Sequence, residues 1–352
     1  MGDADEIGVG IVGYGLAGRS FHAPFIVAAG GLALKAVATA NPERRRCAAD
    51  EHPAAAVVGT PEELIDHPDV GVVVVAAPNR FHVPIAIRAL AAGRHTVVDK
   101  PIAMDVAEAE TLLEAADRAN RVLTVYQNRR WDGDFLTARR LIDEGVLGQV
   151  DSLEARFERW SRVGPEWREI AAEGGGPLPD LGAHLIDQSL ILFGSARSVW
   201  AQADRRRPDS QVDDSVFVAI DHVNGVRSRL WVSLTASRVG PRMRIRGAVA
   251  EYVKEDLDPQ EAQLLDGMRP DDPVFGVEPS ERWGRLFLAD GSMTSVQTER
   301  GSYLRFYEQL REAIHGRVAP PVNPLDSVRV LRVLAAADRA AKTGQAQTMS
   351  GW

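Results

Sequence analysis

The sequence predicts an α/β protein of two domains: an N-terminal, doubly wound parallel sheet, then an α+β domain built on an open, mainly antiparallel sheet. Three observations indicate this. A glycine-rich strand–helix turn stands near the start, strand and helix patterns alternate over the first third, and longer alternating strands with hairpin signals follow. The length of 352 residues is typical of two domains. We place the boundary after Tyr126, giving 1–126 and 127–352, with the last helix a candidate to pack back on the first domain.

The first domain opens with an apolar strand that runs into Gly13-Tyr14-Gly15-Leu16-Ala17-Gly18. This is G-x-G-x-x-G in its informative context, with a strand before it and a helical pattern after it. Gly13 allows a tight turn, Gly15 lets the backbone approach a pyrophosphate, and Gly18 lets helix and strand pack closely. The helix then offers N–H groups and its positive dipole end to phosphates. The motif predicts a dinucleotide site at this turn.

The rest of the first domain alternates regularly. Apolar runs predict buried parallel strands, and Pro42 is suited to the first turn of a helix. We expect strands at 32–38, 57–58, 70–76, 95–99 and 123–126, and helices from Pro42, at 82–92 and at 106–120.

The end of the second strand bears on which dinucleotide is bound. An acidic residue there would bind the ribose hydroxyls and favour NAD. The segment instead reads Thr39-Ala40-Asn41-Pro42-Glu43-Arg44-Arg45-Arg46, with no acid at the strand end. Thr39 and the arginines, Arg44 among them, could accept a 2′-phosphate, which favours NADP over NAD. The alternative is that the arginines form the solvated face of a helix.

Lys100 directly follows the fifth strand, in Val97-Val98-Asp99-Lys100-Pro101. Ligands of open α/β sheets bind beyond the carboxyl ends of the strands, where this lysine falls. Pro101 favours an extended Lys100. Only four of the 41 basic residues are lysines, which hints that arginine would not serve here. An ammonium at this place could stabilise a developing alkoxide; the alternative is an ordinary surface lysine.

The second domain changes pattern. Alternating apolar residues predict strands at 215–221 and 229–235, joined by the hairpin signal Asn224-Gly225, and Asp290-Gly291 marks a second hairpin. Both faces of this sheet carry apolar side chains, so one could meet a second subunit in a homodimer or homotetramer. Helices are expected at 135–144, 303–314 and 325–342.

A stretch rich in glycine and proline leads into Asp180-Leu181-Gly182-Ala183-His184-Leu185-Ile186-Asp187. Asp180 is expected at or near a helix N-cap, and Asp180, His184 and Asp187 share one helical stripe. A histidine with a carboxylate one turn away suits general acid–base chemistry. The alternatives are a capping aspartate with a core histidine, or a metal site. No further cluster of histidines or carboxylates completes a metal site, so no metal is expected.

Composition excludes several classes. The net charge of −8 and the absence of a basic stripe argue against nucleic acid. Cys47 is the only cysteine, which rules out an intrachain disulfide. No apolar run approaches the roughly 20 residues that span a bilayer, and no signal-peptide pattern begins the chain, so a cytoplasmic protein is expected.

The glycine motif, Asp99-Lys100-Pro101, and Asp180 with His184, in this order, resemble the glucose–fructose oxidoreductase / inositol dehydrogenase / rhizopine-catabolism (Gfo/Idh/MocA) family. The resemblance spans nearly the whole chain. It implies that Lys100 is the catalytic lysine and that Asp180 and His184 complete the catalytic set. Asp99 stands where the family usually has glutamate. The loop Ala77-Pro78-Asn79-Arg80-Phe81-His82 is similar to the family's loop along the cofactor, which implies that Ala77, Pro78, Asn79, His82 and Asp99 bind it.

Finer features are similar to a subgroup of NADP-dependent scyllo-inositol dehydrogenases: Phe21-His22-Ala23-Pro24, Tyr126-Gln127-Asn128-Arg129-Arg130-Trp131-Asp132, Trp167-Arg168-Glu169 and Gly301-Ser302-Tyr303. Polar side chains with aromatic walls suit a polyhydroxylated ring. The resemblance implies substrate contacts from Tyr126, Asn128, Arg129, Trp131, Trp167, Arg168, Asp187 and Tyr303. The alternative for Arg129-Arg130-Trp131 is a packing cluster.

Together these features predict an NAD(P)-dependent oxidoreductase that moves a hydride between nicotinamide and a secondary hydroxyl of a cyclic polyol or sugar. His184 is the expected base, oriented by Asp180, and Lys100 stabilises the reacting oxygen. Two other functions stay open. One is a ketose, aldose or acidic-sugar oxidoreductase, in which an arginine pairs with a substrate carboxylate. The other is a catalytically silent dinucleotide-binding regulator.

Overall fold

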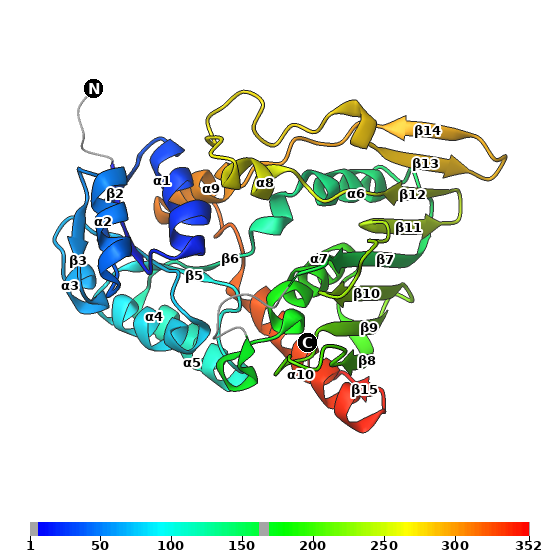
Figure 1. Cartoon of the computed structure of the whole chain (residues 1–352), viewed down its shortest axis with the longest axis horizontal. Helices are drawn as coiled ribbons and strands as arrows, with labels where there is room; N and C mark the ends of the chain where they lie inside the picture. Colours follow the sequence, from blue (N-terminus) through cyan, green and yellow to red (C-terminus); the bar gives the residue numbers. More distant parts are fainter. Residues whose placement is uncertain (1–5, 162–168, 352) are drawn as a thin grey trace. The chain divides into compact units, whose positions relative to one another are not determined.

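The computed structural model describes residues 6–161 and 169–351, which group into two compact units (Figure 1). Unit 1 contains the chain up to Asn128 together with Gln260–Phe275 and Ser302–Val328. Unit 2 contains Arg129–Pro259, Gly276–Gly301 and the chain from Arg329 onward. The boundary expected after Tyr126 lies close to the first division. The two later segments of unit 1 differ from the sequence-based assignment, which gave everything beyond 126 to the second domain.

Unit 1 is built on six parallel strands in the order β3-β2-β1-β4-β5-β6. The direction of strand order reverses between β1 and β4, which is the switch point where such sheets bind ligands. The Val72–Val75 run is completely buried, as expected of a central parallel strand. The strands are β1 (Ile7–Val12), β2 (Leu32–Ala38), β3 (Ala56–Val58), β4 (Val72–Val75), β5 (His95–Asp99) and β6 (Leu123–Tyr126). The predicted doubly wound sheet is confirmed.

The helices of unit 1 begin where the sequence signals place them. Asn41 caps α2, its Oδ1 accepting the N–H groups of Glu43 and Arg44, and Pro42 is the first helical residue. α3 is absent from the predicted elements, although Thr60 and Glu63 form a capping box around its first turn. These helices are α1 (Ala23–Ala28), α2 (Pro42–Glu51), α3 (Pro61–Ile65), α4 (His82–Ala91), α5 (Val106–Ala119), α8 (Gln260–Leu265) and α9 (Leu304–Ile314).

Unit 2 contains a nine-stranded sheet in the order β14-β13-β12-β11-β7-β10-β9-β8-β15. Its neighbouring strands are antiparallel except for β10 and β7, which are parallel. The hairpins predicted at Asn224-Gly225 and Asp290-Gly291 are confirmed; they join β9 to β10 and β13 to β14. The strands are β7 (Val150–Glu158), β8 (Ala196–Asp204), β9 (Ser215–His222), β10 (Arg227–Ser233), β11 (Met243–Gly247), β12 (Ala250–Lys254), β13 (Gly284–Leu288), β14 (Met293–Val296) and β15 (Gln347–Thr348).

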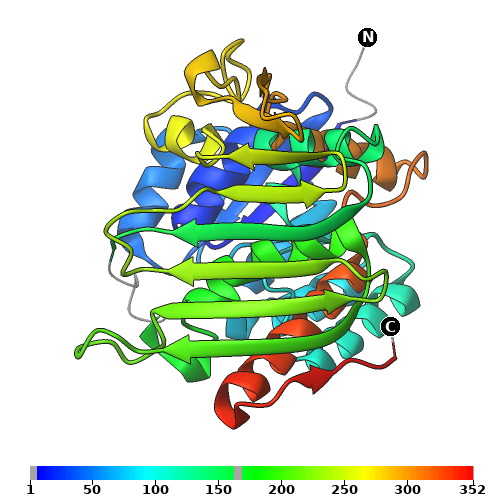
Figure 2. The same ribbon diagram turned by 90° about the vertical axis from the view of Figure 1, so that its right-hand side faces the viewer.

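The two faces of this sheet differ. On one face apolar side chains of β7, β9 and β10 are buried, and α7 (Ala183–Phe193) packs on β7 and β10. Figure 2 looks onto the opposite face, where no helix of unit 2 lies over the strands in the described part of the chain. There Phe217 lies between Trp200 and Trp231, with ring centroids 5.9 and 5.0 Å apart. Two further helices belong here in whole or in part: α6 (Gly133–Asp143) and α10 (Pro324–Thr343), whose first residues group with unit 1.

The helix that carries His184 begins differently from the prediction. A π turn over Leu178–Gly182 precedes α7, and Gly182 is the N-cap residue of α7. Asp180, expected at or near the N-cap, lies two residues before it, and the alternative that it caps α7 does not fit. A π turn holds more residues than an α turn, so the spacing from Asp180 to His184 does not follow the simple helical stripe.

Candidate active site

The glycine loop of unit 1 is shaped by close backbone contacts. Gly13 has φ of 98°, and a Cβ added to it would lie 2.3 Å from the Ala76 carbonyl oxygen. A Cβ on Gly18 would lie 2.0 Å from the carbonyl oxygen of Gly13. At Gly15 the nearest neighbour of an added Cβ is the Arg44 guanidinium, 3.5 Å away. The first and third glycines thus close the turn, and the second leaves room beside a cation.

Tyr14 contributes to the loop differently from the expectation. Its side chain is buried, and its hydroxyl donates to Glu51 Oε2 at 2.7 Å. Burial, then this carboxylate, raises the pKa of Tyr14, so the hydroxyl keeps its proton. Arg19 also pairs with Glu51 and so ties the motif helix to α2. Only the backbone of Tyr14 remains suited to a cofactor.

Two arginines after β2, Arg44 and Arg45, make different contacts. Arg45 donates from Nε to the carbonyl oxygen of Thr39 at 2.8 Å and so braces the end of the strand. Arg44 extends from α2 to the glycine loop. Thr39 is largely buried at the strand end. The interpretation that these arginines are only a solvated helix face does not fit Arg45, which has a partner, and stays open for Arg44, which is exposed.

The loops after β4 and β5 are joined by His82. Its ring is buried, with Nε2 2.8 Å from the Ala77 carbonyl oxygen and Nδ1 2.7 Å from that of Pro101. Burial lowers the pKa of His82, and the nearby charge of Asp99 opposes this. The Asp99 carboxylate accepts the backbone N–H of Lys100 at 2.8 Å. Ala77, Pro78, Asn79, His82, Asp99 and Lys100, all expected near the cofactor, thus belong to two loops at one edge of the sheet.

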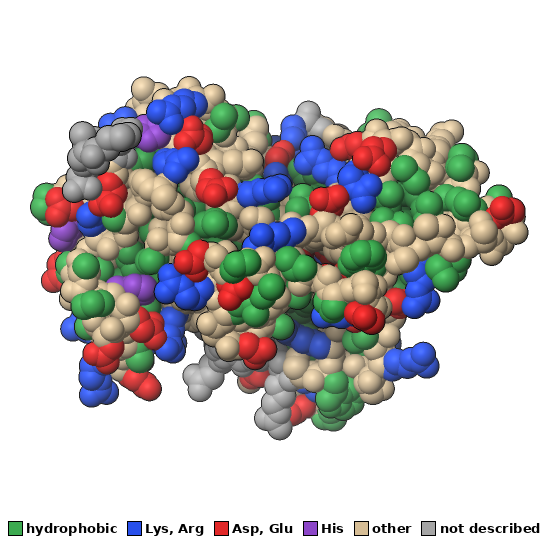
Figure 3. All heavy atoms as spheres, turned by 90° about the horizontal axis from the view of Figure 1, so that it is seen from above, with side chains coloured by type: hydrophobic (Ala, Val, Ile, Leu, Met, Phe, Trp, Pro, Cys, Tyr) green, Lys and Arg blue, Asp and Glu red, His purple; other side chains and the backbone are tan. Residues whose placement is uncertain are grey.

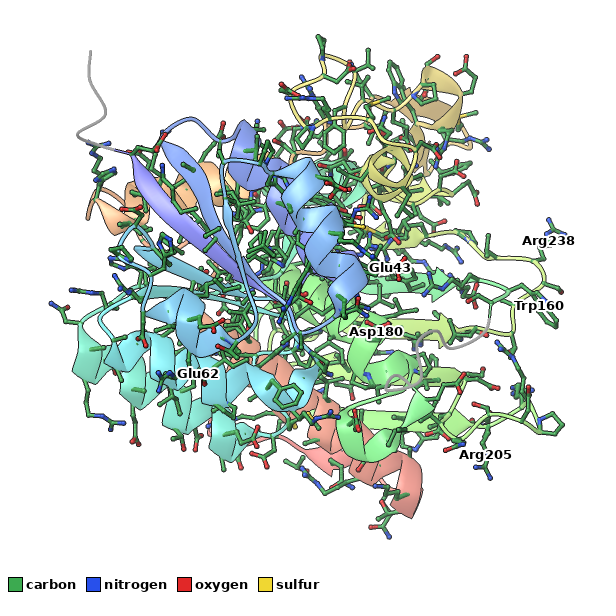
Figure 4. The ribbon with its side chains drawn as sticks, turned by 60° about the vertical axis from the view of Figure 1, so that its left-hand side comes forward. Glu43, Glu62, Trp160, Asp180, Arg205 and Arg238 are labelled. Carbon is green, nitrogen blue, oxygen red and sulfur yellow. The ribbon has the colours of Figure 1, made fainter. Side chains whose placement is uncertain are left out.

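His184 stands in the first turn of α7 and is 5% exposed. Asp180 is half-buried on the π turn before it, where Figure 4 labels it, and its N–H donates to the Gly176 carbonyl oxygen at 3.3 Å. The two residues lie on consecutive turns of the same unit. Trp167 and Arg168, expected to contact substrate, lie outside the described residues.

Two of the other expected substrate residues, Asp187 and Arg129, form buried ion pairs in unit 2. Arg130 donates to both oxygens of Asp187, from Nε at 2.8 Å and from Nη2 at 2.6 Å. Arg129 pairs with Asp132 at 3.3 Å and lies over the ring of Phe157. The side chains of Asn128 and Trp131 are nearly buried in the same turn. Asp187 and Arg129 thus have partners within the fold, and their contacts with substrate stay a prediction.

Tyr126 and Tyr303, also expected to bind substrate, lie in the interior of unit 1. The Tyr126 ring packs on His22, with centroids 4.3 Å apart, and on Phe306. Tyr303 is completely buried with its ring against Phe25. Both are packing residues here. Their expected contacts with substrate stay a prediction.

Two residues at this edge were missed. His22 lies 3.8 Å from Asp99 through its Nε2, and Tyr307 lies 2.5 Å from its Nδ1. The only signal was Phe21-His22-Ala23-Pro24, read as a subgroup feature without a role. Tyr307 gave none, because a tyrosine on an amphipathic helix is ordinarily core.

Some absences also bear on the chemistry. Within 6–161 and 169–351, no group of three or more histidine, cysteine, aspartate or glutamate side chains is placed to hold a metal ion. In the same ranges no helix has the length and hydropathy needed to cross a membrane. The face shown in Figure 3 carries interspersed positive and negative side chains.

Comparison with known proteins identifies the family. The model of the oxidoreductase family with an NAD-binding Rossmann fold matches residues 7–127, and the GFO/IDH/MocA C-terminal domain matches 135–253. Scyllo-inositol 2-dehydrogenase (NADP(+)) IolW of Bacillus subtilis is 34% identical over 342 residues, covering 96% of this chain and 94% of that protein. D-glucoside 3-dehydrogenase of Escherichia coli is 29% identical over 64% of this chain and 68% of its own length. The crystal structure of yvaA from Bacillus subtilis superposes with a TM-score of 0.94 at 32% identity, covering 99% of this chain and 100% of that one. This chain belongs to the Gfo/Idh/MocA oxidoreductase family.

Proposed function

We propose that this enzyme is an NADP-preferring dehydrogenase that oxidises a secondary ring hydroxyl of a cyclic polyol or sugar, with an inositol favoured. The observation that carries the proposal is the place of Lys100. It directly follows β5, in the unit whose glycine loop follows β1, at the edge where parallel sheets bind ligands. The names of three relatives support the substrate class, since they describe dehydrogenases of scyllo-inositol, a D-glucoside and levoglucosan.

The residues of unit 1 fit a dinucleotide phosphate. Gly13 and Gly18 leave no room for a side chain, and the space at Gly15 is bounded by the Arg44 guanidinium. Backbone N–H groups of the loop would hold the pyrophosphate, and Arg44 would pair with the 2′-phosphate that distinguishes NADP from NAD. When bound, the nicotinamide supplies the hydride acceptor.

We assign the transfer of the hydroxyl proton to side chains of this protein. A carbonyl forms from an alcohol only if the hydroxyl proton leaves, and we assign its removal to His184, with Asp180 orienting the ring. The Lys100 ammonium donates a hydrogen bond to the oxygen as negative charge develops. In the reverse direction His184 returns the proton. Asp99 and His82 hold the backbone on either side of Lys100.

The partners of two of the three candidate arginines argue against their pairing with an acidic sugar; the third, Arg168, lies outside the described residues. Arg130 is occupied by the carboxylate of Asp187, and Arg129 pairs with Asp132. A substrate carboxylate would have to displace one of these buried partners, which leaves a buried charge uncompensated. A neutral polyol requires no such exchange.

The uncovered face of the unit 2 sheet suits a second copy of the chain. Its central row carries Phe217 and Trp231, and Arg156 lies over the Trp231 ring with its guanidinium carbon 4.1 Å from the centroid. A homodimer through this face, or a homotetramer, would bury that aromatic row. Sedimentation of the wild type and of Trp231→Glu checks this. A monomeric wild type, or an unchanged assembly in the variant, argues against it.

The first experiment titrates the purified protein with NADPH and with NADH by nicotinamide fluorescence, then screens inositols and neutral sugars for NADP⁺ reduction. We expect tighter binding of NADPH and oxidation of scyllo-inositol or a related ring. Tight binding without any turnover, together with a co-purifying protein, would support a silent regulator instead. Absence of binding of both forms would contradict the proposal.

A further inference from the structure

In unit 1, His22 lies next to Asp99, and Tyr307 lies next to His22. Neither side chain has a role in the proposed function. His22 ends the π turn that follows the glycine loop, and Tyr307 stands on α9; both side chains are completely buried. Nδ1 of His22 lies 2.5 Å from the Tyr307 hydroxyl. Nε2 of the same ring lies 3.8 Å from Asp99 Oδ2. The imidazole therefore stands between a phenol and a carboxylate.

The neighbours of His22 indicate which of its two ring nitrogens carries the proton. Burial raises the pKa of Tyr307 well above its ordinary value, so the hydroxyl keeps its proton and can donate it to Nδ1 of His22. A neutral imidazole that accepts at Nδ1 carries its single hydrogen on Nε2, the nitrogen that faces Asp99. Burial alone would raise the pKa of Asp99, but His22, Lys100 and His82 together outweigh it and lower that pKa. The carboxylate stays ionised and is faced by an N–H.

Asp99 in turn fixes the backbone of Lys100. One carboxylate oxygen accepts the Lys100 N–H at 2.8 Å, while the other faces His22. On the far side, His82 lies 2.7 Å from the Pro101 carbonyl oxygen. One buried imidazole, His82, thus contacts the Pro101 carbonyl, and the other, His22, lies 3.8 Å from the carboxylate that accepts the Lys100 N–H. π turns inserted in helices are frequent at functional sites, and this one places His22.

We propose that His22, oriented by Tyr307, is a positioning residue for Lys100. It holds the Asp99 carboxylate in place and thereby fixes the backbone from which the lysine extends toward the reacting oxygen. This rests on the proposed role of Lys100. Because η1 (Ala17–His22) begins at the glycine loop, the same contact joins the dinucleotide-binding turn to the segment that carries the lysine.

The kinetic test removes single groups from this chain of contacts. Tyr307→Phe keeps the ring that packs on Tyr126 and removes only the hydroxyl. We expect kcat for scyllo-inositol with NADP⁺ to fall about tenfold, the kinetic equivalent of one lost hydrogen bond. The KM for the inositol and the Kd for NADPH should stay within about twofold, since neither ligand loses a contact. Tyr252→Phe, which removes a buried tyrosine hydroxyl in unit 2, is the matched control and should leave kcat unchanged.

Conservative replacement of His22 separates positioning from packing. His22→Leu fills the space without an N–H, and we expect a drop in kcat of about 100-fold, of the order that acid–base groups contribute. His22→Gln restores an N–H near the place of Nε2 and should recover about tenfold of that loss. Equal kcat values in the leucine and glutamine variants would overturn the proposal.

A second readout needs no substrate. The chain has eight histidines, so selective ¹⁵N labelling of the whole protein allows the His22 resonances to be assigned by their loss in His22→Gln. We expect a proton on Nε2 and none on Nδ1 in the wild type, and loss of this preference in Tyr307→Phe. A proton on Nδ1 only, or an unchanged tautomer in the variant, would overturn the proposal. If no inositol or sugar is oxidised, the proposed function fails while this measurement still decides the place of His22.

Discussion

The guanidinium of Arg44 stands over Gly15, 3.5 Å from where a Cβ of that glycine would be. A fixed cation beside the second glycine of a phosphate-binding loop is not needed for packing, since Arg44 is exposed and its helix is capped by Asn41. It is instead the natural partner of a phosphate group. We propose that the preference between the two dinucleotides depends on this side chain.

Arg44→Ala is expected to weaken NADPH binding at least about tenfold, because a charge-assisted contact to the 2′-phosphate is lost. NADH lacks that phosphate, so its Kd should change less than about twofold. Fluorescence titration of both cofactors measures the ratio. Arg46→Ala, two positions later on α2, is the control. Parallel weakening of both cofactors in Arg44→Ala would argue that Arg44 acts only through the shape of the loop.

Alanine substitutions at Gly13 and Gly145 distinguish the cost of a positive φ from the cost of a steric clash. Both have positive φ, 98° and 70°, but an added Cβ meets the Ala76 carbonyl oxygen at Gly13 and nothing within 4 Å at Gly145. Gly145→Ala should cost about 1 kcal/mol of stability, the price of a left-handed alanine, with cofactor binding unchanged. Gly13→Ala should cost more and abolish NADPH binding, because the turn itself must move. Thermal melts with and without NADPH check both, and equal melting points for the two variants would contradict the clash.

Local patterns were sufficient to predict most of this fold. The glycine motif, the buried valine run of β4 and the Asn224-Gly225 hairpin each depend on neighbours in sequence, and each was found where expected. The pairing of the polar side chains was harder to predict, because the two members of each pair are distant in sequence. Arg130 and Asp187 are 57 positions apart, and His22 and Tyr307 are 285 positions apart. A single sequence shows a charged side chain but not which partner neutralises it, so the pairing of Asp187 with Arg130 was not predicted.

Variants of the Arg130–Asp187 pair test whether Asp187 has a structural role or contacts substrate. If Asp187 is a structural partner, Asp187→Asn removes the carboxylate that accepts two hydrogen bonds from Arg130 and should cost about 3–5 kcal/mol of stability. In Arg130→Gln/Asp187→Asn both charges are gone, so the loss should be smaller than the sum of the single losses. Urea unfolding of the wild type and the three variants completes the cycle. A raised KM for the polyol with unchanged stability would instead return Asp187 to the substrate site.

Lys100→Met and His184→Ala should each lower turnover at least about 100-fold, because the first removes the donor to the reacting oxygen and the second removes the base. NADPH should still bind to both, since the glycine loop and Arg44 are intact. Turnover of a verified substrate and fluorescence titration are measured on the same preparations. Wild-type turnover in both variants would sink the catalytic assignment, whereas loss of cofactor binding would point to a disturbed fold.

We expect His222 to make the stability of the protein dependent on pH. Its Nδ1 lies 2.9 Å from the Gly194 carbonyl oxygen, and its Nε2 lies 2.9 Å from the hydroxyl of Ser228, which is itself bonded to Ser189. A neutral ring satisfies this arrangement: it donates at Nδ1 and accepts at Nε2. Burial, the largest cause, lowers the pKa of His222 in the folded protein below the value of about 6.5 expected for the unfolded chain.

It follows that the unfolded state binds more protons than the folded state once the pH falls below about 6.5. Stability should therefore decrease as the pH is lowered from about 7.5 to about 5.5, with buried His82, whose pKa is also lowered, adding to the slope. Urea midpoints at the two pH values measure it. His222→Asn, which can still donate at the position of Nδ1 but does not titrate, should show a shallower decrease. If the wild type and this variant lose stability equally, His222 is already protonated in the fold or does not contribute to the slope.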